Sequence, residues 1–216
     1  YREIDQLGGF DPYSASKASV EIAISSWRSS FSGAMKLESN LLSIASARAG
    51  NVIGGGDWSE NRLVPDAMRS LSKGASIPIR NPNHTRPWQY VLEPLRGYII
   101  LAEKLYESTI HKNENNKFAR AFNFGPSNNL DKSVLSLVNE ILINWKGTYH
   151  IISNSDSQHE SSRLSLSSEL ANNLLYWKSV LTFSESINKT VNWYKYYYSN
   201  RDCLEYSIKE INNYID

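Results

Sequence analysis

The feature that most constrains the fold is the alternation of short apolar runs with longer segments of helical periodicity. The run Leu41–Ala47 has the length and character of a buried parallel strand. Further extended runs lie at residues 77–80, 120–124 and 149–152, and helical patterns cover residues 61–73, 93–108, 133–144, 167–175, 184–197 and 202–214. Strands that alternate with helices are typical of layered α/β proteins, so we expect a mixed α/β fold.

Charge and composition exclude several classes of protein. With 23 basic and 22 acidic side chains the net charge is +1, which argues against a nucleic-acid partner. No apolar run approaches the roughly 20 residues that cross a bilayer, so we expect no membrane partner. The single cysteine, Cys203, cannot form an internal disulfide, which fits a reducing compartment. These features together predict a cytoplasmic protein.

The first helix is expected over residues 13–31. Asp11 can cap the free N–H groups of a helix, and Pro12 is tolerated in its first turn. Apolar residues follow at helical spacing, and small or apolar residues extend this surface around a second side: Val20, Ile24, Trp27 and Phe31 on one side, and Ala15, Ala18 and Ile22 on the other. A helix that is apolar on two sides usually packs against its own sheet and against something else. We therefore expect a homodimer in which this helix meets its symmetry mate.

Tyr13 and Lys17 are the sharpest candidates for catalysis. Residues four apart lie one above the other on a helix. A phenol with a pKa of about 10 is a poor base at neutral pH, but an ammonium group beside it favours the phenolate. Such a pair can take a proton from a sugar hydroxyl while hydride leaves the same carbon, which suits an oxidised nicotinamide. Random placement supplies roughly 0.7 pairs with this spacing, so the context must decide.

Several motifs in a fixed order provide that context. The run GGFDPYSASKASVE at residues 8–21 resembles the active-site helix of the extended short-chain dehydrogenase/reductase family. The later runs are similar to those of the nucleotide-sugar enzymes of that family: ARAGNVIGGGDW at 47–58, RLVPD at 62–66, IRNP at 79–82 and TRPWQYVLEPLRGYIILAE at 85–103. The GGGDW and RPWQYVLEP runs favour a CDP-sugar form.

The resemblance implies a role for each matching residue. Tyr13 and Lys17 correspond to the catalytic tyrosine and the lysine that also holds the ribose of the cofactor NAD. The substrate side is expected to involve Asn51 near the diphosphate, Arg86 paired with the diphosphate, and Arg62 and Arg80 at the nucleotide pocket. An arginine fork binds phosphate oxygens bidentately, although each of these arginines could also be a solvated loop charge.

The implied reaction is NAD-dependent dehydration of CDP-glucose to CDP-4-keto-6-deoxyglucose, as in deoxysugar and O-antigen biosynthesis. Hydride leaves C4, the C5 proton and the C6 hydroxyl leave as water, and hydride returns to C6, so that NAD is regenerated. The alternatives are another nucleotide-sugar dehydratase or epimerase, and a non-catalytic module for sugar-nucleotide binding or assembly.

The resemblance also predicts the architecture. Residues 1–53 are expected to be the remnant of a doubly wound Rossmann-type parallel sheet with the active-site helix. Residues 54–216 are expected to form mainly a smaller mixed α/β substrate-binding lobe, with some segments returning to the sheet. Only twelve residues precede Tyr13, so we expect no Gly-rich turn for the cofactor pyrophosphate, and neither tight NAD binding nor dehydration by this chain alone.

Three further patterns lead to expectations about local structure. The histidines His84, His111, His150 and His159 lack metal-ligand spacing, so we expect no metal site. Gly54–Gly56 lacks the spacing of a phosphate-binding loop, and tight backbone geometry beside substrate is the favoured interpretation. Tyr176 stands where related chains place a glycine at a helix end, so we expect a strained or rerouted turn.

Overall fold

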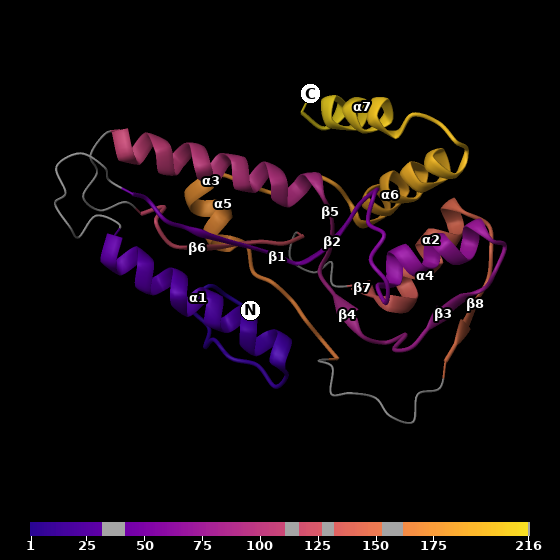
Figure 1. Cartoon of the computed structure of the whole chain (residues 1–216), viewed down its shortest axis with the longest axis horizontal. Helices are drawn as coiled ribbons and strands as arrows, with labels where there is room; N and C mark the ends of the chain where they lie inside the picture. Colours follow the sequence, from indigo (N-terminus) through magenta and orange to yellow (C-terminus); the bar gives the residue numbers. More distant parts are fainter. Residues whose placement is uncertain (32–41, 111–116, 127–131, 153–161, 216) are drawn as a thin grey trace. The chain divides into compact units, whose positions relative to one another are not determined.

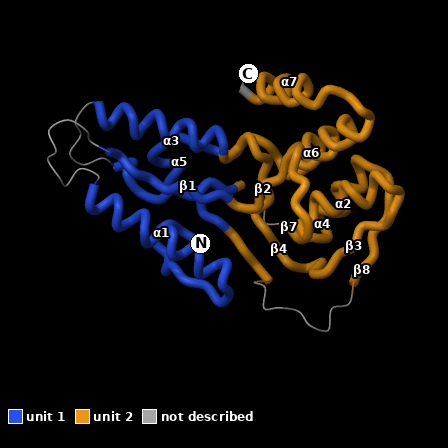
Figure 2. Tube along the Cα trace, in the orientation of Figure 1, with its two compact units in different colours: residues 1–49, 95–125, 166–178 blue, residues 50–94, 126–165, 179–216 orange. Residues whose placement is uncertain are grey.

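The computed structural model describes residues 1–31, 42–110, 117–126, 132–152 and 162–215. They belong to two compact units (Figure 2). Unit 1 comprises residues 1–49, 95–125 and 166–178, and unit 2 comprises residues 50–94, 126–165 and 179–216. Each unit is assembled from three separate stretches of chain, so neither folds from local contacts alone.

Unit 1 is layered around one parallel pair of strands, β1 (Ser46–Ala49) and β6 (Ala121–Phe124). One face of the pair is covered by α5 (Glu169–Leu175) and by α3 (Leu92–Ile110), whose first three residues belong to unit 2. The other face is approached by α1 (Pro12–Phe31) (Figure 1). The core of unit 1 is a small aromatic cluster. The ring centroid of Phe124 lies 5.1 Å from that of Trp177 and 5.5 Å from that of Tyr98.

Unit 2 contains three further strand pairs. The parallel pairs are β2 (Asn51–Ile53) with β5 (Trp88–Tyr90) and β3 (Ile77–Ile79) with β8 (Tyr149–Ile151); the antiparallel pair is β4 (Thr85–Arg86) with β7 (Lys132–Ser133). Its helices are α2 (Leu63–Ser72), α4 (Val134–Asn144), α6 (Phe183–Tyr198) and α7 (Cys203–Ile215).

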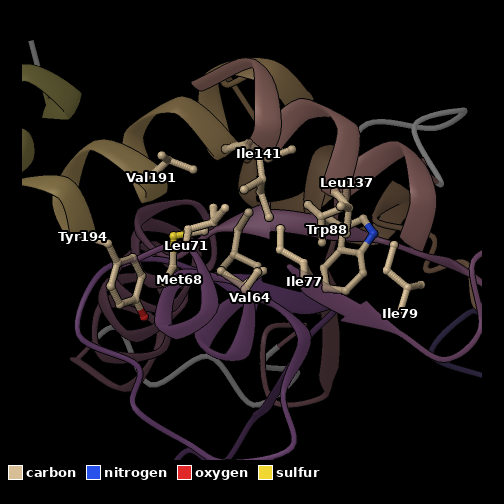
Figure 3. Packing of buried hydrophobic residues seen from close by; sticks show 14 residues of the cluster. Val64, Met68, Leu71, Ile77, Ile79, Trp88, Leu137, Ile141, Val191 and Tyr194 are labelled. Carbon is tan, nitrogen blue, oxygen red and sulfur yellow. The ribbon is translucent and has the colours of Figure 1, made fainter. Parts of the chain in front are cut away.

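The core of unit 2 is a continuous apolar cluster from helices and strands. Side chains of α2, α4 and α6 pack against Ile77 and Ile79 of β3 and Trp88 of β5 (Figure 3). Helix α6 begins with a capping box, in which Thr182 and Glu185 satisfy each other's backbone N–H groups. The helix therefore starts at Phe183, one residue before the expected start, and its buried face includes Ile187, Val191 and Tyr194.

The expected mixed α/β fold and its helices are confirmed, but two local expectations are wrong. The strand expected over Leu41–Ala47 is β1 at Ser46–Ala49, because pairing begins only where Ser46 faces Ala121 of β6. The glycines of residues 48–58 (RAGNVIGGGDW) predict a loop, but this stretch includes the end of β1 and all of β2. Residue 41 lies outside the described part of the chain.

The expectation at Tyr176 is confirmed. Tyr176 ends α5 in the left-handed region, with φ of 54° and ψ of 24°. Its backbone N–H donates to the carbonyl oxygen of Ala171, and its ring is exposed. A tyrosine therefore occupies a conformation that favours glycine, and the strain is local to this turn.

Candidate active-site helix and substrate-binding residues

Asp11 starts α1 as expected. Its Oδ1 accepts hydrogen bonds from the backbone N–H of Tyr13 at 2.9 Å and of Ser14 at 3.0 Å. Its Oδ2 accepts a hydrogen bond from the Ser14 hydroxyl at 2.6 Å. The hydrogen bonds from the side chain and then the backbone of Ser14 hold the pKa of the Asp11 carboxyl below its ordinary value. The first turn, which carries Tyr13, is thereby fixed.

Tyr13 and Lys17 lie together on this helix. The ammonium nitrogen of Lys17 is 5.4 Å from the centre of the Tyr13 ring. The ring is 71% exposed, so its hydroxyl is open to a ligand. An accessible phenol can exchange a proton with a ligand hydroxyl that comes within hydrogen-bond distance of it.

The face by which α1 approaches β1 differs from the expected one. Val20, Trp27 and Phe31 are exposed, and none of the residues of α1 is buried. The half-buried residues of the helix are mostly small or polar: Ser14, Ala18, Glu21, Ile24 and Arg28. The helix is thus held to its strand largely through polar contacts, while its apolar stripe faces outward.

Glu21 and Arg48 are the residues of this region that the sequence argument missed. The carboxylate of Glu21 on α1 accepts hydrogen bonds from Nε and Nη2 of Arg48 on β1, each at 2.8 Å. The hydrogen bonds from the Arg48 guanidinium lower the pKa of Glu21, although burial opposes this shift. The same hydrogen bonds raise the pKa of Arg48. The available signal was the position of Glu21, one further helical turn beyond Tyr13 and Lys17.

Asn51 and Arg86 both lie in unit 2, on β2 and β4, and the backbone of Asn51 is hydrogen-bonded to Pro87, the residue after Arg86. Asn51 starts β2, where its backbone N–H donates to the carbonyl oxygen of Pro87 at 3.0 Å. Arg86 lies on β4, is only 9% exposed and donates from Nη1 to the carbonyl oxygen of Thr85 at 2.8 Å. Gly50 allows this close approach, because a Cβ there would lie 2.6 Å from the Pro87 oxygen.

Arg62 and Arg80 lie at the ends of other elements of unit 2. Arg62 caps the start of α2, and its exposed guanidinium lies 3.8 Å from the Asp57 carboxylate. Burial alone would raise the pKa of Asp57, but hydrogen bonds from Ser59 and the charges of Arg62 and Arg69 lower it overall. Arg80 directly follows β3 and is exposed. Both guanidinium groups are therefore accessible to an anionic ligand.

The glycines at 54–56 show tight backbone geometry, but their neighbours are side chains of the protein. A Cβ on Gly54 would lie 2.7 Å from Val91, and one on Gly55 would lie 2.1 Å from the Trp193 ring. Gly56 has a φ of 80°. These glycines let β2 lead into a turn beneath α6.

Among the described residues, no group of three or more histidine, cysteine, aspartate or glutamate side chains lies so that it could hold a metal ion. His150 is exposed on β8 and shares a hydrogen bond with the Ser76 hydroxyl at 3.1 Å. His111 and His159 lie outside the described residues. Within the described part of the chain, no helix has the length and apolar character needed to span a membrane.

The fold and the candidate site define a class of protein. A parallel strand pair with helices on both faces, one of them carrying the Tyr13–Lys17 pair, is a Rossmann-type α/β arrangement. The model of the NAD dependent epimerase/dehydratase family matches residues 3–115, which is more than half of the chain. The chain belongs to this family.

Curated relatives place the chain near the 4,6-dehydratases. It is 39% identical over all 216 residues to CDP-glucose 4,6-dehydratase of Salmonella typhimurium, and covers 58% of that protein. It is 27% identical over 191 residues to dTDP-glucose 4,6-dehydratase 1 of Escherichia coli K12, which corresponds to 85% of this chain and 47% of that protein. The chain thus spans only part of the length of these relatives.

Solved structures agree on the fold. The dTDP-glucose 4,6-dehydratase DesIV of Streptomyces venezuelae, solved with NAD and TYD bound, matches with a TM-score of 0.74 at 17% identity over 94% of this chain and 56% of its own. The dTDP-glucose 4,6-dehydratase of Bacillus anthracis, solved with NAD, matches with a TM-score of 0.69 at 19% identity over 90% of this chain and 55% of its own. The expected Rossmann-type fold is confirmed.

Proposed function

We propose that a polypeptide carrying this chain catalyses the NAD-dependent dehydration of CDP-glucose to CDP-4-keto-6-deoxyglucose. The observation that carries the proposal is the 39% identity to the CDP-glucose enzyme over the whole chain, against 27% over 85% of it for the dTDP-glucose enzyme. The product would serve deoxysugar biosynthesis, including that of O-antigen. Because the chain spans 58% and 47% of these relatives, the activity is assigned to the complete protein.

Tyr13 acts as the general base in this proposal. Its exposed hydroxyl group takes the proton of the C4 hydroxyl of the sugar, and the Lys17 ammonium lies 5.4 Å from the centre of the ring. Lys17 is exposed on α1, and its ammonium group suits a hydrogen bond to a ribose hydroxyl of NAD. When bound, NAD supplies the acceptor for the hydride that leaves C4.

Asn51, Arg62, Arg80 and Arg86 are proposed to bind the nucleotide sugar. Arg86 is the best suited to a diphosphate, because its guanidinium is partly oriented by the Thr85 carbonyl and lies in a largely buried strand. Arg62 and Arg80 are exposed and suit the nucleotide end. On this assignment residues 1–53 belong to the dinucleotide-binding domain and residues 54–216 mainly to the sugar-nucleotide lobe.

The test is product analysis with the complete enzyme. Incubation with NAD and CDP-glucose should yield a nucleotide sugar lighter by one water, whereas an epimerase would leave the mass unchanged. Parallel incubations with dTDP-, UDP- and GDP-glucose should give much less product. Equal turnover of dTDP-glucose would overturn the assigned nucleotide. Calorimetric binding of CDP-glucose without any product would instead support a non-catalytic sugar-nucleotide module.

The Tyr13→Phe variant tests the proposed base. It keeps the packing of the ring and removes the proton acceptor, so turnover should fall by roughly 10²–10⁴ while CDP-glucose still binds. Mass spectrometry of the product and calorimetry with CDP-glucose measure the two effects. Unchanged turnover would exclude Tyr13 as the base.

The exposed stripe of α1 is proposed to form a homodimer. Trp27 and Phe31 lie with ring centroids 5.0 Å apart, and Trp27 is 59% exposed, so an isologous helix pair would remove a large apolar area from water. Light scattering should give twice the monomer mass, and Trp27→Glu should give the monomer. The cytoplasm is the proposed compartment, and cell fractionation tests it.

A further inference from the structure

One ion pair, between Glu21 and Arg48, joins α1 to β1 near the proposed base. Tyr13, Lys17 and Glu21 are spaced four residues apart and form a continuous row along the helix surface. Eight residues separate Glu21 from Tyr13, a rise of about 12 Å at 1.5 Å per residue. Any rotation or sliding of α1 at Glu21 is therefore transmitted directly to Tyr13 and Lys17.

Three hydrogen bonds hold the Glu21 carboxylate against β1. Arg48 donates from Nε and Nη2 to the two carboxylate oxygens, each at 2.8 Å, and the Ser46 hydroxyl donates to Oε2 at 2.9 Å. Ser46 and Arg48 are two residues apart, so both project from the same face of the strand. The side chains of Arg48 and Glu21 are only 24% and 17% exposed. A bidentate fork with these restraints sets both the distance and the direction of the contact.

Within one copy of the described chain, apolar packing contributes little to holding this helix against β1. None of the residues of α1 is buried, and its large apolar side chains Val20, Trp27 and Phe31 are exposed. A second polar tie, from Arg28 Nε to the carbonyl oxygen of Ile44 at 2.9 Å, lies near the far end of the helix. Arg28 is fifteen residues from Tyr13, a rise of about 22 Å, so Glu21 is the nearer of the two contacts to the proposed base.

We propose that Glu21 and Arg48 are positioning residues, which set the rotation of α1 on β1 and thereby aim Tyr13 and Lys17 at the reacting sugar carbon. The proposal rests on the function proposed above. Neither residue touches substrate or cofactor in this account. A misplacement of about 1 Å at a reacting group can cost roughly 10²-fold in rate, and this sets the expected effect.

The test compares Glu21→Gln with Glu107→Gln in the complete enzyme. Glu21→Gln keeps the size of the side chain and loses the charge, and kcat should fall by roughly 10- to 100-fold while KM for CDP-glucose stays within a factor of two. Glu107→Gln removes the partner of an exposed ion pair with Lys104 on α3 of the same unit, and kcat should not change. The paired exchange Glu21→Arg with Arg48→Glu should recover part of the lost kcat.

Hydrogen exchange provides a readout that does not depend on turnover. In Glu21→Gln the amides of residues 15–20 should exchange faster than in the parent, while the amides of α3 keep their protection. Unchanged exchange in α1 would overturn the proposal, as would an unchanged kcat. An equal loss of kcat in Glu107→Gln would also overturn it, because the effect would then be general destabilisation.

The failure of this proposal can be separated from failure of the proposed function. If Tyr13→Phe abolishes turnover but Glu21→Gln does not lower it, the positioning role is wrong and the base assignment stands. If the parent forms no product from any nucleotide sugar, the proposed function is wrong. The exchange experiment then still decides whether Glu21 holds α1 in place.

Discussion

The two units bury their apolar residues to very different extents. In unit 2 side chains from α2, α4 and α6 close over the strands in one continuous cluster. In unit 1 the buried cluster lies only on the side of α3 and α5, and α1 on the other side contributes no buried residue. Unit 2 is therefore stabilised mainly by its own core, whereas the described contacts of α1 with the rest of unit 1 are largely polar. Mutations should expose this difference.

Trp177→Ala is expected to have the largest effect, and it should act on unit 1. Trp177 is fully buried and its ring packs edge-on against Phe124. Its loss should reduce the free energy of unfolding of that unit by about 3–5 kcal/mol through lost burial and a cavity. Hydrogen exchange should show β1 and β6 losing protection while α4 and α6 keep theirs. Leu137→Ala, at a fully buried position of α4, should give the reverse pattern. Equal loss in both units would mean that they unfold as one.

Gly55→Ala should destabilise unit 2 by overpacking. The added Cβ would lie 2.1 Å from the Trp193 ring, so the ring or the backbone must move. The expected cost is about 1–3 kcal/mol, measured by urea unfolding. In a Trp193→Leu background the same substitution should cost less, because the clash is removed. An equal cost in both backgrounds would place the strain in the backbone of the glycine turn instead.

Tyr194→Phe should lower the stability of unit 2 slightly at neutral pH and should make that stability less sensitive to alkaline pH. Tyr194 is fully buried and donates from its hydroxyl to the carbonyl oxygen of Asp57 at 2.6 Å. Losing this hydrogen bond should cost about 1 kcal/mol at neutral pH, measured by urea unfolding. The edge-on contact between the rings of Trp58 and Tyr194 should persist, because phenylalanine keeps the ring in place.

The pH dependence of Tyr194 follows from burial, which raises the pKa of its phenol, as it does for Tyr90. A raised pKa in the folded state means that the stability is fully present below pH 10, the ordinary phenol pKa, and is lost as pH rises towards the folded value. Each phenol then steepens the loss by up to about 1.4 kcal/mol per pH unit. Urea unfolding at several pH values above 10 should show that the free energy of unfolding falls less steeply with pH in Tyr194→Phe than in the parent. An identical slope would contradict this account.

Tyr176→Gly should have the smallest effect and the opposite sign. Tyr176 has a φ of 54°, and its ring is 84% exposed, so glycine relieves backbone strain and loses little packing. Unit 1 should gain about 1 kcal/mol or less, measured by thermal unfolding. Tyr176→Ala is the matched control, because it removes the ring but keeps the Cβ and the strain. A gain of equal size in the control would show that the ring, rather than the backbone, is unfavourable.

The sequence alone determined those features that depend on neighbours along the chain. The Asp11 cap, the helical spacing of Tyr13 and Lys17 and the left-handed turn at Tyr176 all depend on residues within one or two turns of each other. Motif order also identified the family and the residues proposed to bind nucleotide sugar. Local hydrogen bonding and side-chain spacing suffice for such features, because each is complete within a short segment.

Only the tertiary structure decided which residues meet across the chain. Strands β2 and β5 are three residues long, too short to show a period, and each is a strand only because Asn51 pairs with Trp88. The start of β1 is set in the same way by its register with β6. The contact of Glu21 with Arg48 was not predicted either: the spacing of Glu21 from Lys17 places it on the same side of the helix but does not show that it meets Arg48 of β1. Its burial against β1 depends on a folded sheet that no local pattern of residues encodes.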